Sequence, residues 1–266
     1  MRLRTEAAGL RIGYERTGSG PPVLLAHGFV GDGPATFDRV AADLAADFTV
    51  LVPDLPGAGE SAPPPAGSGV DLYADVLADL LRAEAGGPAA VVGLSFGGVA
   101  GIALADRNPD LVAALVLAGA YAGWAGSLPP EEVDRRLRLS VRVAEAEPEE
   151  RVAALAPSMF SPDPEPDLVA GFVDSVARLD PRGFLAMTRA VAAADLRPAL
   201  PRVAVPTLVL HAEHDVRAGR EVADGLRSAV PGARLVELHG VGHVSPVEAP
   251  TAFARAVRGF LAQLEW

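Results

Sequence analysis

The pentapeptide Gly93-Leu94-Ser95-Phe96-Gly97 has the composition of a turn that presents a nucleophilic serine. The apolar run 89–92 precedes it, and the helix-compatible segment 98–107 follows. A serine on a sharp strand-to-helix turn is strained so that its hydroxyl leaves the sheet, and its flanking positions must lack side chains. The amide of Phe96 would lie at the helix N-terminus, where developing negative charge is favoured. We therefore predict Ser95 as a nucleophile and the Phe96 amide as an oxyanion donor.

A serine hydroxyl reacts slowly at neutral pH unless a base accepts its proton and an acid holds that base in one tautomer. Of the five histidines in the chain, His243 lies in a glycine-rich loop after the last expected strand. From there, its side chain can reach across the carboxyl edge of a sheet. Asp215 follows an earlier strand and is the expected acid, while Glu213 on the same loop is the alternative. Ser95, Asp215 and His243 are thus the predicted catalytic residues.

No metal or cofactor site is expected. His211 and His214 have the spacing of some metal ligands, but a strand end followed by a loop does not place them on one helical face, and no third ligand is evident. The chain has no Gly-x-Gly-x-x-Gly after a first strand and no phosphate-binding loop. We therefore expect no cofactor.

The elements that must position these side chains follow an alternating pattern. Residues 2–6 and 10–16 alternate around Gly9 and predict an antiparallel hairpin. Further strands are expected at 23–26, 48–52, 89–93, 111–117, 207–211 and 234–238, and helices at 36–46, 72–85, 98–107, 219–230 and 250–264. Buried strands that alternate with helices indicate an α/β fold, in which helices cover both faces of an open sheet.

The alternation stops between Tyr121 and about Pro201. This segment is helical in pattern and repeatedly interrupted by proline. It predicts a helical cap, or lid, over residues 121–201. The core would then comprise residues 1–120 and 202–266.

Composition excludes several classes of protein. Half of the 266 residues are hydrophobic and 21% are charged, as in a globular domain. The net charge of -11 argues against nucleic acid or anionic membranes as partners. The absence of cysteine excludes disulfides and thiolate chemistry. Without an apolar leader or a bilayer-crossing run, a cytoplasmic protein is expected, with a small molecule as its partner. The sequence does not indicate an oligomeric state.

The serine turn at residues 93–97, called the elbow below, and the chain order serine, acid, histidine resemble those of the α/β-hydrolase fold superfamily. The resemblance covers nearly the whole chain. The resemblance implies a mostly parallel eight-stranded sheet with helices on both faces and an inserted helical cap. It also implies that the loop His27-Gly28-Phe29 supplies the second oxyanion donor, the Phe29 amide. In such proteins, the residue equivalent to His27 usually has a structural part.

A second segment, Asp54 to Ser61, matches the family's Asp-x-x-Gly-x-Gly-x-Ser turn, so Asp54 is expected to stabilise that turn. The chain departs from the family pattern at Ala58, where histidine is common, and at Ala212, where glycine is often found. No proline follows Asp215, where one is frequent. None of these departures removes a chemical group that the reaction needs. Glu248 suits the N-terminus of the last helix.

The resemblance implies a serine esterase or enol-lactonase that forms an acyl-enzyme on Ser95, which water then cleaves. A carboxylic ester or lactone of a small hydrophobic substrate is the favoured target. Relatives that open epoxides or displace halide use aspartate at the elbow, so those activities are disfavoured. The candidate substrate contacts in the cap, each of which could equally pack the cap on the core, are Trp124, Met159, Phe160, Phe172, Phe184 and Met187; His27 and Gly28 are two further candidates in the core.

Four other functions stay open at this point. The same three residues serve in hydrolysis of a carbon-carbon bond in a β-diketone or dienoic acid. Removal of an N-terminal proline from peptides would need acidic cap residues, which the segment 163–167 offers. The fold also serves natural-product tailoring or cyclising enzymes and non-catalytic ligand-binding proteins.

Overall fold

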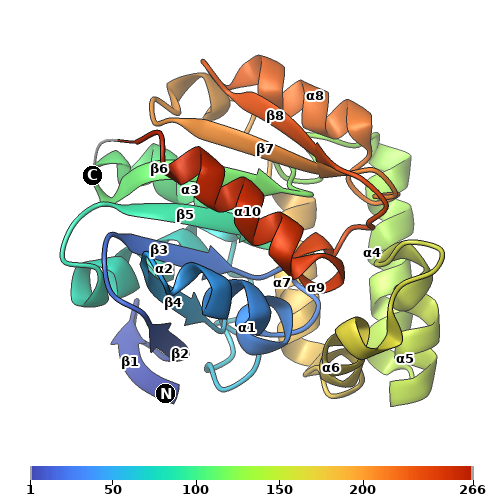
Figure 1. Cartoon of the computed structure of the whole chain (residues 1–266). Helices are drawn as coiled ribbons and strands as arrows, with labels where there is room; N and C mark the ends of the chain where they lie inside the picture. Colours follow the sequence, from blue (N-terminus) through green and yellow to red (C-terminus); the bar gives the residue numbers. More distant parts are fainter. Residues whose placement is uncertain (1, 265–266) are drawn as a thin grey trace.

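A single eight-stranded sheet forms the centre of the molecule (Figure 1). The computed structural model describes residues 2–264, and the outer limits of the expected core, residues 1 and 265–266, lie outside this range. The strand order is β1-β2-β4-β3-β5-β6-β7-β8. The strands are β1 (Arg2–Ala7), β2 (Leu10–Thr17), β3 (Pro22–Ala26), β4 (Thr49–Pro53), β5 (Ala89–Leu94), β6 (Val112–Ala118), β7 (Thr207–Ala212) and β8 (Arg234–Leu238).

Most of the sheet is parallel, because helices connect its successive strands. Within residues 2–264, only β1 with β2 and β2 with β4 pair antiparallel. Every residue of β5 is buried, as expected for a strand covered on both faces. The carboxyl ends of β5, β7 and β8 lie along one edge of the sheet. The loops that hold Ser95, Asp215 and His243 therefore begin on that edge.

Helices cover both faces of the sheet (Figure 1). Helices α1 (Gly33–Leu44) and α10 (Pro250–Leu261) pack against each other, with the short α9 (Ser245–Glu248) beside them. Helix α2 (Val70–Glu84) packs against α3 (Phe96–Arg107), and α8 (Arg220–Ala229) packs against β7. Residues 96–105 of α3 are all buried, so this helix is apolar all round instead of amphipathic. The predicted α/β fold, with its mostly parallel eight-stranded sheet, is confirmed.

Four helices lie between β6 and β7. These are α4 (Pro130–Glu145), α5 (Pro148–Leu155), α6 (Pro166–Ala177) and α7 (Pro181–Ala193), and Figure 1 shows α4, α5 and α6 gathered at one side of the sheet. Each begins with proline, whose missing N–H is no loss at the first helical position. Several prolines that interrupt the sequence pattern thus mark helix starts. The division into a core and a 121–201 cap stays a prediction.

Element boundaries differ from the sequence expectations by a few residues. Helix α1 begins at Gly33 instead of residue 36, because the Asp32 side chain caps it by accepting a hydrogen bond from the Ala35 amide. The last helix ends at Leu261, before residue 264. Helix α9 was not anticipated. Over residues 2–264, none of the helices has the length and apolar character that a bilayer span requires.

Candidate active site

Ser95 lies on the strained turn between β5 and α3. Its φ of +52° is in the left-handed region, which residues other than glycine rarely adopt. A Cβ atom at Gly93 would lie 2.4 Å from the Gly97 carbonyl carbon, and one at Gly97 would lie 2.1 Å from the Ala26 oxygen. Both flanking glycines are therefore sterically required, as the sequence predicts. The turn directs Ser95 away from the sheet at the N-terminus of α3.

His243 and Asp215 form a buried hydrogen-bonded pair. The distance between His243 Nδ1 and Asp215 Oδ2 is 2.8 Å, and the Asp215 Oδ1 atom accepts the Arg217 and Ala218 amides at 2.8 and 2.9 Å. Burial raises the pKa of Asp215, but the His243 interaction and the two amides outweigh burial and hold that pKa below its usual value. The imidazole is thus oriented by an ionised carboxylate, which leaves Nε2 free.

Glu213, the alternative acid, lies elsewhere. Its side chain is exposed and accepts the Gly240 amide at 2.8 Å. That contact holds the loop that leads to His243 but does not involve the imidazole. The structure therefore brings Asp215, and not Glu213, to His243.

Ser95 and His243 line one small cavity together with Gly28 and Phe29. Its free space of about 10 Å³ is close to the room that one water needs. A Cβ atom on Gly28 would lie 3.5 Å from the Ser95 Cβ, so the loop after β3 runs directly beside the serine. Amides in the first turn of α3, including that of Phe96, have no acceptor within the helix. The loop after β3 and the first turn of α3 thus both adjoin Ser95, and the oxyanion role of the Phe29 and Phe96 amides stays a prediction.

His27 has a different environment from its neighbours in the loop. It is fully buried, its Nδ1 lies 2.6 Å from the Gly28 oxygen, and its Nε2 accepts the Leu55 amide at 2.8 Å. Burial lowers its pKa, which favours the neutral ring that this arrangement needs. With both nitrogens bonded to backbone groups, His27 joins two loops instead of facing the cavity. This geometry favours the structural part that the resemblance implies over substrate contact.

Asp54 stabilises the turn that follows β4. Its carboxylate accepts the Gly33 amide at 3.0 Å and the Glu60 amide at 2.8 Å, and it contacts the Arg2 guanidinium. The Ser61 hydroxyl donates to the Asp54 carbonyl oxygen at 2.6 Å. These bonds connect the turn after β4 with strand β1 and with the start of α1, as the expected turn would.

The predicted substrate contacts separate into three groups. Met159 and Phe172 line the cavity at Ser95. Trp124 packs edge-on against Phe29, with ring centroids 5.7 Å apart, and Phe160 packs edge-on against Phe172 at 5.8 Å; neither lines that cavity. The third group, Phe184 and Met187, lines a larger neighbouring cavity.

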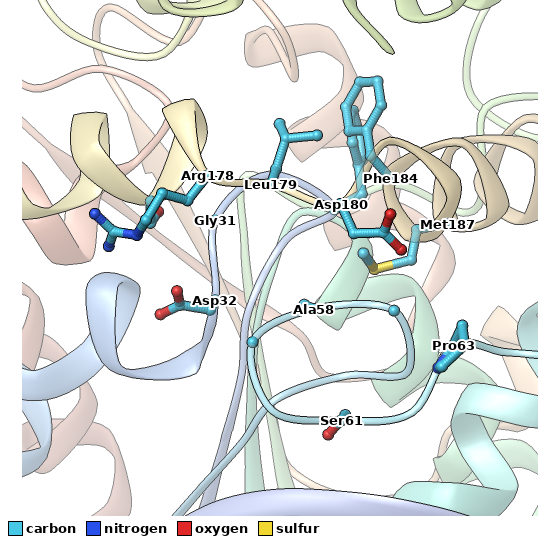
Figure 2. A pocket seen from close by; sticks show the side chains of 14 residues that line it. Gly31, Asp32, Ala58, Ser61, Pro63, Arg178, Leu179, Asp180, Phe184 and Met187 are labelled. Atoms are coloured by element: carbon cyan, nitrogen blue, oxygen red, sulfur yellow. The ribbon is translucent and has the colours of Figure 1, made fainter. Parts of the chain in front are cut away.

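This neighbouring cavity has a volume of about 410 Å³ and shares Phe29 with the cavity at Ser95. Figure 2 shows Met187 of α7 pointing toward the loop of Ala58 and Ser61 after β4, whereas the Phe184 ring on the same helix points away from that loop. Phe29 therefore lines both the small cavity at Ser95 and the larger cavity beside it.

Loop residues after β8 are joined to the segment between β6 and β7. The Val244 amide donates to the Met159 oxygen at 2.9 Å. The Glu248 carboxylate accepts the Gly242 amide at 2.8 Å and the Ser161 amide at 3.1 Å. Glu248 ends α9 directly before the N-cap of α10, the helix whose N-terminus it was expected to suit, and its carboxylate also connects the two segments.

Arg217 is a lining residue that the sequence reasoning missed. It belongs to the same cavity as Ser95 and His243, and its guanidinium carbon lies 5.5 Å from the centre of the Phe29 ring. The signal was its position two residues after Asp215. Nothing in the sequence shows that its side chain turns into the cavity, because the residues that it contacts come from distant segments.

The two histidines considered as metal ligands differ in burial. His211 is buried on β7, whereas His214 is exposed in the following loop. Within residues 2–264, no three histidine or acidic side chains gather in a way that could hold a metal ion.

Fold and site together define a hydrolase in which a serine follows the central strand. Residues 23–256 match the profile of the alpha/beta hydrolase family, and the chain belongs to that family. The predicted recognition of this family, and of an enzyme of its esterase type, is confirmed.

Relatives cover almost the whole chain. A pimeloyl-[acyl-carrier protein] methyl ester esterase from Chromobacterium violaceum is 32% identical over 93% of this chain and 97% of its own. An esterase from Thermogutta terrifontis superposes with a TM-score of 0.89 at 28% identity, covering 99% of this chain and 98% of its own. The enol-lactonase from Burkholderia xenovorans superposes with a TM-score of 0.88 at 27% identity, covering 98% of this chain and 100% of its own.

Proposed function

We propose that this protein hydrolyses a carboxylic ester or lactone through an acyl-enzyme on Ser95. The observation that carries the proposal is the 2.8 Å bond between His243 and Asp215, with that same imidazole and Ser95 lining one cavity. A base held in one orientation beside a strained serine is the arrangement that activates a hydroxyl.

The reaction has two steps. His243 Nε2 accepts the Ser95 proton as Oγ attacks the carbonyl carbon, and Asp215 stabilises the imidazolium. The amides of Phe29 and Phe96 hold the negative oxygen of the tetrahedral intermediate, each contributing about 3 kcal/mol to lowering the barrier. His243 then protonates the leaving alcohol, and water attacks the acyl-enzyme by the same route in reverse.

The bond class is supported by the relatives. The three proteins compared above are an ester hydrolase with a methyl ester substrate, an esterase and an enol-lactonase. An ester and a lactone present the same carbonyl to the serine and differ only in whether the leaving oxygen stays attached. The cavity at Ser95 is small and largely apolar in its lining, which favours a compact acyl or alcohol group.

Ser95→Ala tests the nucleophile. We expect its turnover of a short activated ester to fall at least about 10³-fold with the fold unchanged, because the base then has no proton to accept. A fluorophosphonate should label the wild type but not Ser95→Ala. Ser68→Ala, which changes a half-buried loop serine, is the matched control and should be labelled and active like the wild type. Equal labelling of the wild type and Ser95→Ala would refute the proposal.

A substrate panel separates the related reactions. Esters, lactones and β-diketones of similar size should be assayed with the wild type and Ser95→Ala. We expect serine-dependent release of acid from esters or lactones. Serine-dependent cleavage of the diketone alone would replace ester hydrolysis with carbon-carbon bond hydrolysis.

A further inference from the structure

The cavity at Ser95 contains one positively charged side chain. Arg217 lines it with Ser95 and His243, and its guanidinium stacks over Phe29, whose amide is a proposed oxyanion donor. Arginine stays protonated in proteins, so the charge persists at any working pH. A permanent cation thus lies beside the reacting groups.

Protein groups leave most of this guanidinium unoccupied. Its Nη1 donates to the Ser158 hydroxyl at 3.0 Å. Among residues 2–264, no carboxylate lies within ion-pairing distance of the Arg217 side chain. Asp215 is two residues away, but its oxygens are occupied by His243 and by two amides. A guanidinium has five N–H donors, so several remain for a ligand.

The neighbouring Arg136, unlike Arg217, has hydrogen-bond partners for most of its guanidinium group, including a carboxylate. It bonds to Glu132 at 2.6 Å, to the Tyr121 hydroxyl at 2.9 Å and to the Arg217 carbonyl oxygen at 3.0 Å. Its pKa is raised despite burial, whereas burial lowers the pKa of Arg217 more than Tyr121 and Asp215 raise it. Of the two, Arg217 is the one that lacks a counter-charge.

We propose that Arg217 binds a carboxylate of the substrate, so that the preferred ester or lactone is anionic. The planar fork of the guanidinium matches a carboxylate in a two-point contact. Binding would return a counter-charge to a cation that the fold leaves unpaired. This inference rests on the proposed function for its substrate class, but the anion site itself does not require the reaction.

The size of the cavity limits where the carboxylate can lie. Ser95, His243 and Arg217 line one cavity, so an anion that reaches Arg217 from an ester bound at Ser95 lies within a few bonds of the scissile carbonyl; because the free space of about 10 Å³ holds about one water, the lining side chains must move aside for that ester. A long neutral tail does not meet this requirement. Short half-esters and acyloxy acids do.

Two isosteric pairs of esters test the proposal. Monomethyl glutarate and methyl 5-methylhexanoate differ by a carboxylate or an isopropyl group on the acyl side, and 3-acetoxypropanoate and 3-methylbutyl acetate differ likewise on the alcohol side. We expect the wild type to prefer the anionic member of at least one pair. In Arg217→Met, the ratio of kcat/KM within that pair should shift toward the neutral ester by about 10- to 100-fold.

Controls separate charge from packing. Arg217→Lys keeps the charge and should retain part of the preference, while Arg138→Met removes an exposed arginine of α4 and should leave the ratio unchanged. The melting temperature of each variant shows whether it folds. No anionic preference in the wild type, or an equal loss on both members of a pair in Arg217→Met, would overturn the proposal.

Calorimetry keeps this result distinct from failure of the proposed function. Monomethyl glutarate and 3-acetoxypropanoate should each be titrated into Ser95→Ala, which cannot turn them over, and into Ser95→Ala with Arg217→Met. Binding of either compound to the first protein and at least about 10-fold weaker binding to the second supports the anion site, even if no ester is hydrolysed. Absence of binding of both to Ser95→Ala, or equal binding to the two proteins, refutes the anion site, even if esters are hydrolysed.

Discussion

Gly119→Ala should disturb the Asp215–His243 pair without changing either residue. Gly119 follows β6 with a φ of +50°, and its amide donates to the Leu210 oxygen at 3.1 Å. A Cβ atom there would lie 3.0 Å from Asp215 Oδ2, 3.0 Å from His243 Nδ1 and 3.1 Å from His243 Cε1. All three contacts are tighter than normal, so the pair must move by a few tenths of an ångström.

Two separate costs follow from this substitution. The left-handed backbone costs an alanine about 1–2 kcal/mol, which should appear as lost stability. Displacement of the imidazole should lower kcat, and since a shift of about 1 Å can cost about 10²-fold, a smaller shift predicts roughly 10-fold. The stability loss alone would leave the folded enzyme fully active.

Gly232→Ala is the matched control. Its φ is +71°, and a Cβ atom there would meet nothing within 4 Å, so it carries the backbone strain without the contact. Urea unfolding and single-ester kinetics on both variants separate the two costs. We expect similar losses of stability and a fall of kcat in Gly119→Ala alone. Equal kcat in the two variants would refute the argument that this contact positions the imidazole.

Two further predictions follow from buried carboxylates. Glu248→Leu removes the acceptor of the Gly242 and Ser161 amides, so the free energy of unfolding measured by urea denaturation should fall by about 3 kcal/mol. Glu248→Gln should recover part of this loss. Unchanged stability in the leucine variant would contradict the connecting role of Glu248. The lowered pKa of Asp215 stabilises the fold at pH values above its unfolded pKa of about 3.9, and this contribution is lost as the pH falls through the folded value. Below about pH 4, the stability advantage of the wild type over Asp215→Asn should therefore shrink, and an advantage that grows in acid would reverse the assigned direction.

The features of the site that could be predicted from the sequence depend on local steric requirements or on the positions of strand ends. The elbow is recognisable because no residue with a side chain can replace Gly93 or Gly97. A Cβ atom at either position would lie within 2.4 Å of a neighbouring backbone atom. Asp215 and His243 are recognisable because neighbouring parallel strands place the loops that follow them at one edge. Arg217 was missed because its position depends on Phe29 and Ser158, which belong to other segments. Local patterns do not record such distant packing.

Distant packing also connects residues 159–160, between β6 and β7, to the loop that holds His243. The Val244 amide bonds to Met159, and a Cβ atom at Gly242 would lie 2.4 Å from the Phe160 carbonyl carbon, so the loop on either side of His243 is packed against residues 159–160. Movement of residues 159–160 away from this loop would break these contacts. The position of the base and the closure of the cavity are therefore coupled through the backbone of one loop. Because Met159 also lines the cavity, a substrate that displaces this side chain acts directly on the segment that holds His243.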